Sequence, residues 1–262
     1  NAIKGLQPNV MIVLGDRYEM LSAAIPACMN NVPLVHIHGG ERTEGLIDEA
    51  IRHSLTKFSH IHFVSCEEYR NRVVQLGENP NRAFNVGAPF VDNLLATPRT
   101  PKEALFRTLG IDSSKRTIVA CYHPLTLDLN KSSEELSSML DSLDPFCEDF
   151  NIVFSAPNAD PGNRGIHNAI KLFTDSHKNA TLVNSLGRQK YYSLLSFSSL
   201  VIGNSSSGII ETPFFKIPTV NIGSRQKGRY LAQNIISTSG NKKDITSAIN
   251  QALGCDFKEK IS

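Results

Sequence analysis

The sequence of 262 residues lacks a strong excess of either charge, and it lacks a long apolar run. Its 27 lysines and arginines nearly balance its 25 aspartates and glutamates, which leaves a formal charge of +2. That charge is too small for the basic surface of a nucleic-acid coat or a polybasic membrane anchor. No apolar run approaches the roughly 18 residues that a spanning helix needs. We therefore expect neither nucleic acid nor a membrane as a partner.

The five cysteines are odd in number and include no Cys-x-x-Cys pair. Scattered thiols of this kind are typical of a reducing compartment, so we expect reduced cysteines and a cytoplasmic protein. A charged segment followed by a short apolar one, the pattern of a signal peptide, is missing. The chain opens with Asn1 and soon enters a strand pattern, which predicts that the natural protein continues upstream.

Short β-branched runs alternate with amphipathic stretches, the pattern of βαβ units around a parallel sheet. The prolines of Thr97–Pro101 interrupt this rhythm and indicate a domain boundary. We predict an α/β protein of two doubly wound Rossmann-like lobes, residues 1–97 and 98–262, with ligands in the crevice between them. The predicted strands are residues 10–14, 33–37, 60–64, 83–86, 117–121, 151–155, 181–184, 200–202 and 219–222. The predicted helices are residues 19–28, 47–58, 67–76, 134–143, 165–173 and 189–197, with others beginning at Phe90 and Gly208.

A turn rich in serine and glycine, Gly-Asn-Ser-Ser-Ser-Gly at residues 203–208, joins a predicted strand to a predicted helix. Backbone N–H groups at a helix start, with hydroxyls beside them, suit a phosphate group. Glu211, one turn later, could accept hydrogen bonds from a ribose diol. The alternative is an ordinary serine N-cap. The turn is no Walker A loop, because no Gly-Lys-Ser/Thr follows.

A basic loop, Gly-Ser-Arg-Gln-Lys-Gly-Arg at residues 223–229, follows the next predicted strand. Arg225, Lys227 and Arg229 could make charge-assisted hydrogen bonds to a diphosphate, although a solvated basic loop is the better interpretation of this segment alone. Because the two loops follow successive strands, we expect them at the same edge of one sheet. Together they predict a nucleoside diphosphate site.

The first lobe places Asp16 and Arg17 directly after its opening strand, where a sugar or phosphate would lie. The alternative is an N-cap aspartate beside a surface arginine. Helix 47–58 opens with Asp48, and Arg52 lies four residues later on the same face.

Two histidines and a glutamate stand in His-Ile-His-Gly-Gly-Glu at residues 36–41. In an extended segment His36 and His38 would share one side, with Glu41 after a flexible glycine pair. These groups suit proton abstraction and return. The alternative is a zinc site, but His-x-His without a placed third ligand is weak evidence for one, and we expect no metal.

His123, in Cys-Tyr-His-Pro at the end of the second lobe's first strand, would point to the same crevice unless it is a buried core histidine. The sequence has no Gly-x-Ser-x-Gly elbow, which argues against serine hydrolase chemistry. It also has no Gly-x-Gly-x-x-Gly after a strand, which argues against a dinucleotide cofactor.

Five segments in this order resemble the UDP-N-acetylglucosamine 2-epimerase family: residues 15–17, 36–41, 47–53, 203–208 and 223–229. The resemblance is greatest to the hydrolysing branch that makes N-acetylmannosamine for sialic acid, or to its relative that acts on a diacetamido-sugar nucleotide for legionaminic acid. It implies the glycosyltransferase-B fold, a homodimer or homotetramer, a UDP-sugar substrate and no cofactor.

The reaction that this resemblance implies converts UDP-N-acetylglucosamine and water to N-acetylmannosamine and UDP. A base removes the C2 proton, UDP leaves from C1 to give 2-acetamidoglucal, and water then adds. Such chemistry needs positioned carboxylates and a stabilised leaving group. Carried over to this chain, the family pattern implies catalytic roles for Asp16, Asp48 and His123, and substrate or UDP binding by Arg17, Asn158, Ser205, Ser206, Ser207, Gly208, Glu211 and Arg225.

Three departures from the family pattern matter. Many members carry a catalytic glutamate at the position of His38, so the acid or base role here falls to His38 or to Glu41. The family's strand and helix before Gly15 are missing, and its closing helix is not evident after Phe257, so we expect a chain cut at both ends. Alternative functions are the same chemistry on UDP-2,4-diacetamido-2,4,6-trideoxyglucose, a UDP-sugar glycosyltransferase, and a non-enzymatic nucleotide-sugar sensor.

Overall fold

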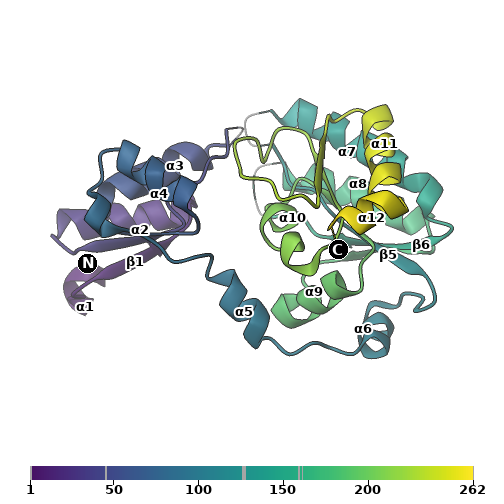
Figure 1. Cartoon of the computed structure of the whole chain (residues 1–262), viewed down its shortest axis with the longest axis horizontal. Helices are drawn as coiled ribbons and strands as arrows, with labels where there is room; N and C mark the ends of the chain where they lie inside the picture. The colour runs from purple at the N-terminus through teal and green to yellow at the C-terminus, as the bar shows by residue number, and fades with distance from the viewer. Residues whose placement is uncertain (1, 45, 126–127, 159, 161, 262) are drawn as a thin grey trace. The chain divides into compact units, whose positions relative to one another are not determined.

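Two parallel β-sheets form the framework of the computed structural model, which describes residues 2–44, 46–125, 128–158, 160 and 162–261 (Figure 1). Contacts between residues divide the chain into two units, Asn1–Asn93 and Leu94–Ser262. The predicted boundary, between residues 97 and 98, lies a few residues further along the chain. Strands alternate with helices in both units, so the α/β prediction is confirmed.

The first unit has a four-stranded parallel sheet in the order β1-β2-β3-β4. Its strands are β1 (Met11–Leu14), β2 (Leu34–Ile37), β3 (Ile61–Val64) and β4 (Ala83–Asn85). Its helices are α1 (Ala2–Leu6), α2 (Tyr18–Met29), α3 (Asp48–Phe58), α4 (Glu67–Gln75) and α5 (Phe90–Ala96), the last of which runs into the second unit, and a 3₁₀ turn covers Pro80–Arg82.

The two faces of the first sheet differ, because successive side chains of a strand point to opposite sides. Helices α2 and α3 bury one face, where Val13, Leu34 and Leu55 belong to a fully apolar core (Figure 1). On the other face, Ile12 of β1 is 63% exposed and Phe84 of β4 is 46% exposed. This unit therefore displays an apolar sheet face to solvent.

The second unit has a six-stranded parallel sheet in the order β10-β9-β8-β5-β6-β7. Its strands are β5 (Arg116–Cys121), β6 (Phe150–Ser155), β7 (Ala180–Val183), β8 (Leu200–Gly203), β9 (Thr219–Ile222) and β10 (Ile235–Thr238). Its helices are α6 (Lys102–Leu109), α7 (Leu129–Leu143), α8 (Asn163–Ser176), α9 (Gly187–Ser196), α10 (Ser207–Ile210), α11 (Lys242–Leu253) and α12 (Cys255–Ile261), with 3₁₀ turns at Asp144–Phe146 and Thr212–Phe215. This is the strand order of a Rossmann fold, with its switch point between β5 and β8.

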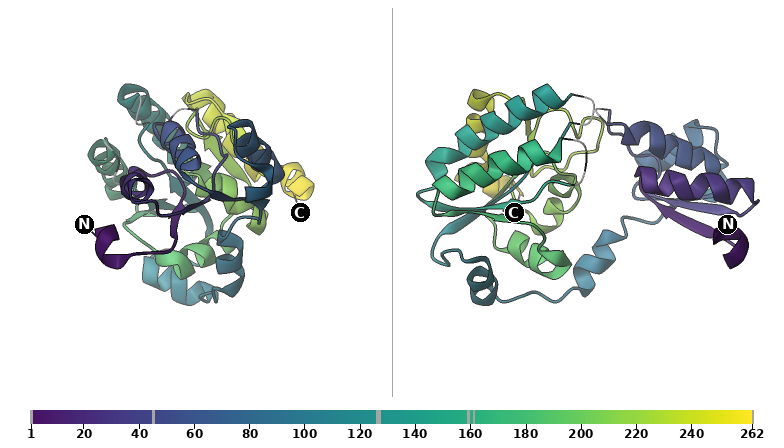
Figure 2. Two further views of the ribbon diagram at one scale, coloured as in Figure 1. Left: turned by 90° about the vertical axis from the view of Figure 1, so that its left-hand side faces the viewer. Right: turned by 180° about the vertical axis from the view of Figure 1, so that it is seen from behind.

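Helices cover both faces of the second sheet. Helices α7, α8 and α11 lie on one side, and α9 lies on the other, as the views from front and back show (Figures 1 and 2). Alternate strand residues such as Ile118, Ile152 and Phe154 pack against Leu136 and Ile249 from the first layer of helices. Burial on both faces explains why these strands are continuous apolar runs in the sequence.

Some elements differ from their predictions. Helix α7 begins at Leu129 rather than residue 134, and the helix predicted from Gly208 is the single turn α10. Strand β10 and helices α6 and α11 were not predicted. Helix α12 was not predicted either. All five cysteines are free thiols, and no described helix is long and apolar enough to cross a membrane.

Candidate active site

The end of strand β8 presses directly against strand β5 at the switch point of the second sheet. Gly203 has a φ of +137°, and a Cβ atom there would lie 1.8 Å from the carbonyl oxygen of Cys121. Only glycine fits, because this backbone conformation and this contact both exclude a side chain. The glycine of the 203–208 motif therefore brings the serine turn next to the strand that carries His123.

Asn204 connects three loops at this edge of the sheet through hydrogen bonds. Its Oδ1 accepts a hydrogen bond from the His123 N–H at 2.7 Å, and its Nδ2 donates to the His123 carbonyl at 2.9 Å. Its own carbonyl oxygen accepts from Arg225 Nη1 at 3.2 Å and from Gln226 Nε2 at 2.8 Å. Asn204 belongs to the serine- and glycine-rich motif, but no role was predicted for it. The available signal was an amide side chain directly after a buried strand, where it must find partners.

The imidazole of His123 is held at both nitrogens. Its Nδ1 lies 3.1 Å from the backbone nitrogen of Asn158, and its Nε2 lies 3.4 Å from Cys121 Sγ. Burial, together with the positive charge of Arg225, lowers the pKa of His123 to about 4 against the opposing effect of Asp160. The ring is therefore neutral at physiological pH.

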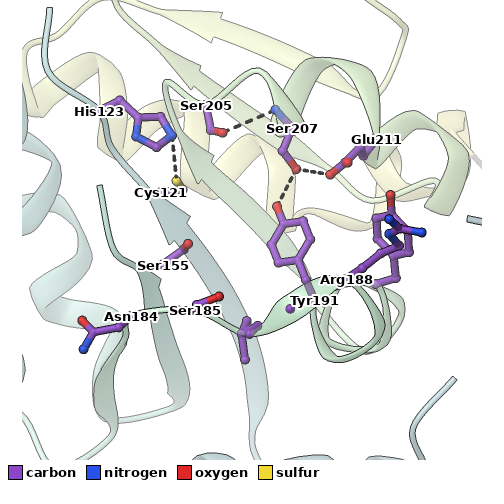
Figure 3. Close-up of a pocket in the computed structure, with 13 residues that line it drawn as sticks. Cys121, His123, Ser155, Asn184, Ser185, Arg188, Tyr191, Ser205, Ser207 and Glu211 are labelled. Carbon is purple, nitrogen blue, oxygen red and sulfur yellow. Dashed lines mark hydrogen bonds between the residues drawn. The ribbon is translucent and has the colours of Figure 1, made fainter. Parts of the chain in front are cut away.

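A cavity of about 420 Å³ opens beside this histidine (Figure 3). Its lining comes from the ends of four strands, β5 to β8, and from helices α9 and α10: Cys121, His123, Ser155, Asn184, Ser185, Leu186, Gly187, Arg188, Tyr191, Tyr192, Ser205, Ser207 and Glu211. Of the sequence-predicted residues, His123, Ser205, Ser207 and Glu211 thus meet in one cavity. Asn158 joins them indirectly through His123, while Gly208 lies buried beneath the turn.

Polar groups on one wall of the cavity form a chain of short hydrogen bonds (Figure 3). The Ser207 hydroxyl donates to Glu211 Oε2 at 2.5 Å, and the Tyr191 hydroxyl lies 2.5 Å from the same serine oxygen. Burial raises the pKa of Glu211 above its usual value. Tyr191 was missed, because an aromatic residue in an amphipathic helix normally indicates core packing.

The two loops bear differently on the alternatives raised for them. Ser206 stands at the N-cap position of α10 and makes no capping hydrogen bond, but the Ser205 hydroxyl accepts one from the Ser207 N–H at 3.4 Å, so a serine cap at this turn stays an alternative. In the basic loop, Lys227 is exposed, whereas Arg225 is buried against Asn204. The solvated-loop interpretation therefore holds for Lys227 and is wrong for Arg225.

In the first unit, the carboxylate of Asp16 binds the guanidinium of Arg52 from helix α3. Arg52 is 0% exposed and also donates to Glu49 Oε2 at 2.7 Å and to Thr43 Oγ1 at 2.8 Å. A buried guanidinium needs such partners, since desolvation of an unpaired charge is very costly. Arg52 thus fixes Asp16 at the end of β1. Arg17, beside it, is half-buried, and its Nε lies 3.6 Å from Glu19.

His38 and Glu41 form a pair, while His36 is separate from them. Strand β2 ends at Ile37 and His38 has a φ of +66°, so the prediction that His36 and His38 share one side of an extended segment is wrong. His36 is buried, donates from Nε2 to the Gly15 carbonyl at 2.8 Å, and has its pKa lowered to about 4 by burial. His38 Nδ1 instead lies 2.9 Å from Glu41 Oε1.

A glycine makes this loop possible. A Cβ atom on Gly40, whose φ is +80°, would lie 2.2 Å from the Tyr69 carbonyl oxygen. Asp48 opens helix α3 close by in sequence and is half-buried. Among the described residues, no group of three or more histidine, cysteine, aspartate or glutamate side chains could hold a metal ion, so the zinc alternative gains no support.

Comparison with known proteins gives one consistent result. The family model described as UDP-N-acetylglucosamine 2-epimerase matches residues 1–261. A Campylobacter jejuni protein, GDP/UDP-N,N'-diacetylbacillosamine 2-epimerase (hydrolyzing), is 41% identical over 99% of this chain and 67% of its own length. The Legionella pneumophila UDP-N,N'-diacetylbacillosamine 2-epimerase (hydrolyzing) is 35% identical over 94% of this chain and 64% of its own length. The chain thus spans about two thirds of these relatives.

Solved structures agree in fold. UDP-GlcNAc 2-epimerase from Neisseria meningitidis, bound to UDP-GlcNAc, has a TM-score of 0.84 at 17% identity, over 99% of this chain and 72% of that one. The Methanocaldococcus jannaschii UDP-GlcNAc 2-epimerase, in complex with UDP-GlcNAc and UDP, has a TM-score of 0.78 at 20% identity. The match covers 97% of this chain and 71% of that one. The prediction of two Rossmann-like lobes of the glycosyltransferase-B type is confirmed.

Proposed function

This chain belongs to the UDP-N-acetylglucosamine 2-epimerase family, and we propose that it acts as a hydrolysing UDP-sugar 2-epimerase. The observation that carries the proposal is the cavity at the switch point of the second sheet. There a serine turn, a buried glutamate and a neutral histidine line one space, and Arg225 lies buried behind the turn. This set suits a ribose and a diphosphate better than it suits an apolar ligand.

We propose that the second unit holds UDP and stabilises it as a leaving group. Ser205, Ser206 and the N–H groups of the turn would bind the diphosphate, with Arg225 supplying positive charge. Glu211 would accept hydrogen bonds from the ribose hydroxyls. Ser207, which already donates to Glu211, would hold that carboxylate in place.

The first unit would supply the proton chemistry. We propose that one of its carboxylates, Asp16 or Asp48, takes the C2 proton while the C1–O bond breaks and its electron pair leaves with UDP. The product of this step is 2-acetamidoglucal, with a C1=C2 double bond. Water then adds its hydroxyl to C1, and a proton reaches C2 on the opposite face. The His38–Glu41 pair is hydrogen-bonded and suits the return step.

The amino sugar has two candidates. N-acetylglucosamine follows from the family as a whole, and its product would be N-acetylmannosamine. The names of the relatives at 41% and 35% identity favour N,N'-diacetylbacillosamine, the 2,4-diacetamido sugar, as a second candidate. The two sugars differ around C4 and C6, away from the reacting C1–C2 bond, so the same catalytic groups would serve either.

NMR in D₂O tests the reaction directly. We expect each turnover to release one UDP and one free 2-epimerised amino sugar that carries deuterium at C2. Matched assays with UDP-N-acetylglucosamine and UDP-N,N'-diacetylbacillosamine then rank the substrates by kcat/KM. UDP release without C2 exchange would contradict the epimerase proposal, and a requirement for an acceptor alcohol would indicate a glycosyltransferase. Binding of both substrates without turnover of either would favour the sensor.

A further inference from the structure

The hydrogen bond at Nδ1 of His123 fixes where the ring carries its proton. The partner of Nδ1 is the backbone N–H of Asn158, at 3.1 Å. A backbone N–H can only donate, so Nδ1 must present its lone pair. In a neutral imidazole the single proton then resides on Nε2.

The protonated nitrogen points to the thiol of Cys121, in the wall of the cavity. Nε2 lies 3.4 Å from Cys121 Sγ, and both residues line the same space as Ser205 and Ser207 (Figure 3). The backbone of His123 is held on both sides by the Asn204 amide. The direction of the Nε2–H bond is therefore set by the fold rather than by a bound ligand.

Neither nitrogen of this ring is ready to accept a proton. The Nδ1 lone pair is engaged by Asn158, and Nε2 already carries hydrogen. The charged groups around the ring are Arg225, which opposes a second proton, and Asp160, which favours one. Burial in the wall of the cavity is the larger cause of the lowered pKa, and the charge of Arg225 acts in the same direction. The imidazolium form is therefore disfavoured at physiological pH.

We infer that His123 acts as a neutral N–H donor to the departing diphosphate and takes no part in proton transfer. In the elimination step the C1–O bond breaks, its electron pair moves to the diphosphate oxygen, and Nε2–H donates a hydrogen bond to an anionic oxygen of that group while keeping its proton. A neutral imidazole can serve as an electrophile in this way when its surroundings lower its pKa. The inference rests on the proposed function, and it makes Asn158 a positioning residue.

The tautomer can be tested without any substrate. Two-dimensional ¹H–¹⁵N spectra of protein labelled at histidine, with the His123 signals identified by their loss in His123→Gln, report which nitrogen bears hydrogen. We expect hydrogen on Nε2 alone, and no titration of this ring from about pH 8 down to pH 5. Hydrogen on Nδ1, or an imidazolium that forms within that range, would overturn the inference whether or not the protein is an epimerase.

A pair of variants tests the role in turnover. His123→Gln keeps an N–H donor near the position of Nε2 but has no basic nitrogen, whereas His123→Leu has neither. We expect kcat to fall by about 10²- to 10³-fold in His123→Leu and by less than about tenfold in His123→Gln. Equal, large losses in both variants would indicate a general base and overturn the inference. Inactivity of the unaltered protein toward every UDP-sugar would instead remove the proposed function, and the tautomer result would stand.

Discussion

His38 and Glu41 are hydrogen-bonded partners across a glycine pair, with 2.9 Å between His38 Nδ1 and Glu41 Oε1. The two residues are not equally accessible, since the His38 side chain is 21% exposed and that of Glu41 is 5% exposed. The imidazole is therefore the more accessible member of the pair. The sequence left the acid or base role open between His38 and Glu41, and the structure places the two in one hydrogen-bonded pair.

Replacing Glu41 by glutamine should impair turnover without weakening nucleotide binding. Glutamine keeps the size of the side chain but removes the charge that pairs with His38, so we expect kcat to fall by about 10²-fold or more. The Kd of UDP, measured by calorimetry, should change less than about twofold because the nucleotide cavity belongs to the other unit. Exchange of Glu103, an exposed glutamate on α6, for glutamine is the control and should alter neither quantity. Normal turnover of Glu41→Gln would remove the pair from the mechanism.

Replacing Arg52 by methionine should destabilise the first unit strongly. The change leaves Asp16 and Glu49 without the guanidinium that binds both, and breaking such a buried network costs about 3–5 kcal/mol. Urea unfolding followed by far-ultraviolet circular dichroism measures the loss, since the chain has no tryptophan to report it. Arg17→Met, at a half-buried site, should shift the free energy of unfolding by only about 0.5 kcal/mol. Equal effects of the two substitutions would show that the Arg52 network contributes little.

Acid should weaken UDP binding through Glu211. Burial raises the pKa of this carboxyl, so it becomes protonated at a higher pH than an ordinary glutamate and then loses capacity to accept ribose hydroxyls. At neutral pH we expect Glu211→Gln to weaken UDP binding by about tenfold, and 2′-deoxy-UDP should be affected less. As the pH falls, the ratio of the two proteins' Kd values should approach one. A ratio that stays constant down to the usual range of a glutamate would contradict the ribose role.

Two glycines with opposite surroundings should respond oppositely to alanine. At Gly203 the added methyl would meet the Cys121 carbonyl at 1.8 Å, so we expect a loss of about 3 kcal/mol or more, or failure to fold. At Gly165, in helix α8, a Cβ meets nothing within 4 Å. Gly165→Ala should therefore stabilise the chain by about 0.5–1 kcal/mol. Thermal unfolding of both variants checks the contrast, and a Gly203→Ala protein of normal stability would show that β8 need not approach β5 this closely.

The hydrophobic pattern predicts most of the framework. Strand β8, for example, is fully buried, so its apolar run stands out from the polar segments on either side. Strand β10 was missed because it lies at the edge of the sheet, where three of its four residues are half-buried and Ser237 is exposed. Its sequence, Ile-Ile-Ser-Thr, is too short and too polar at one end to be distinguished from a loop.

The candidate site was predicted in its residue types more than in its geometry. Spacing along a strand could not reveal that His38 adopts a left-handed backbone, or that Gly40 packs against the Tyr69 carbonyl. It also could not reveal Tyr191, whose partner Ser207 comes from a different element. Contacts between distant segments depend on the tertiary fold, which a local pattern does not contain.

The open apolar face of the first sheet should make molecules of this chain associate in solution. Ile12 and Leu14 are 63% and 55% exposed, and they continue in register through Ile37 toward Phe84. Parallel sheets usually bury both faces, and a contiguous apolar surface of this kind favours association between molecules. The apparent molar mass of this chain, measured by light scattering, should therefore rise with its concentration. Threonine at positions 12 and 14, which suits a strand and lowers hydrophobicity, should raise the concentration at which the solution remains clear.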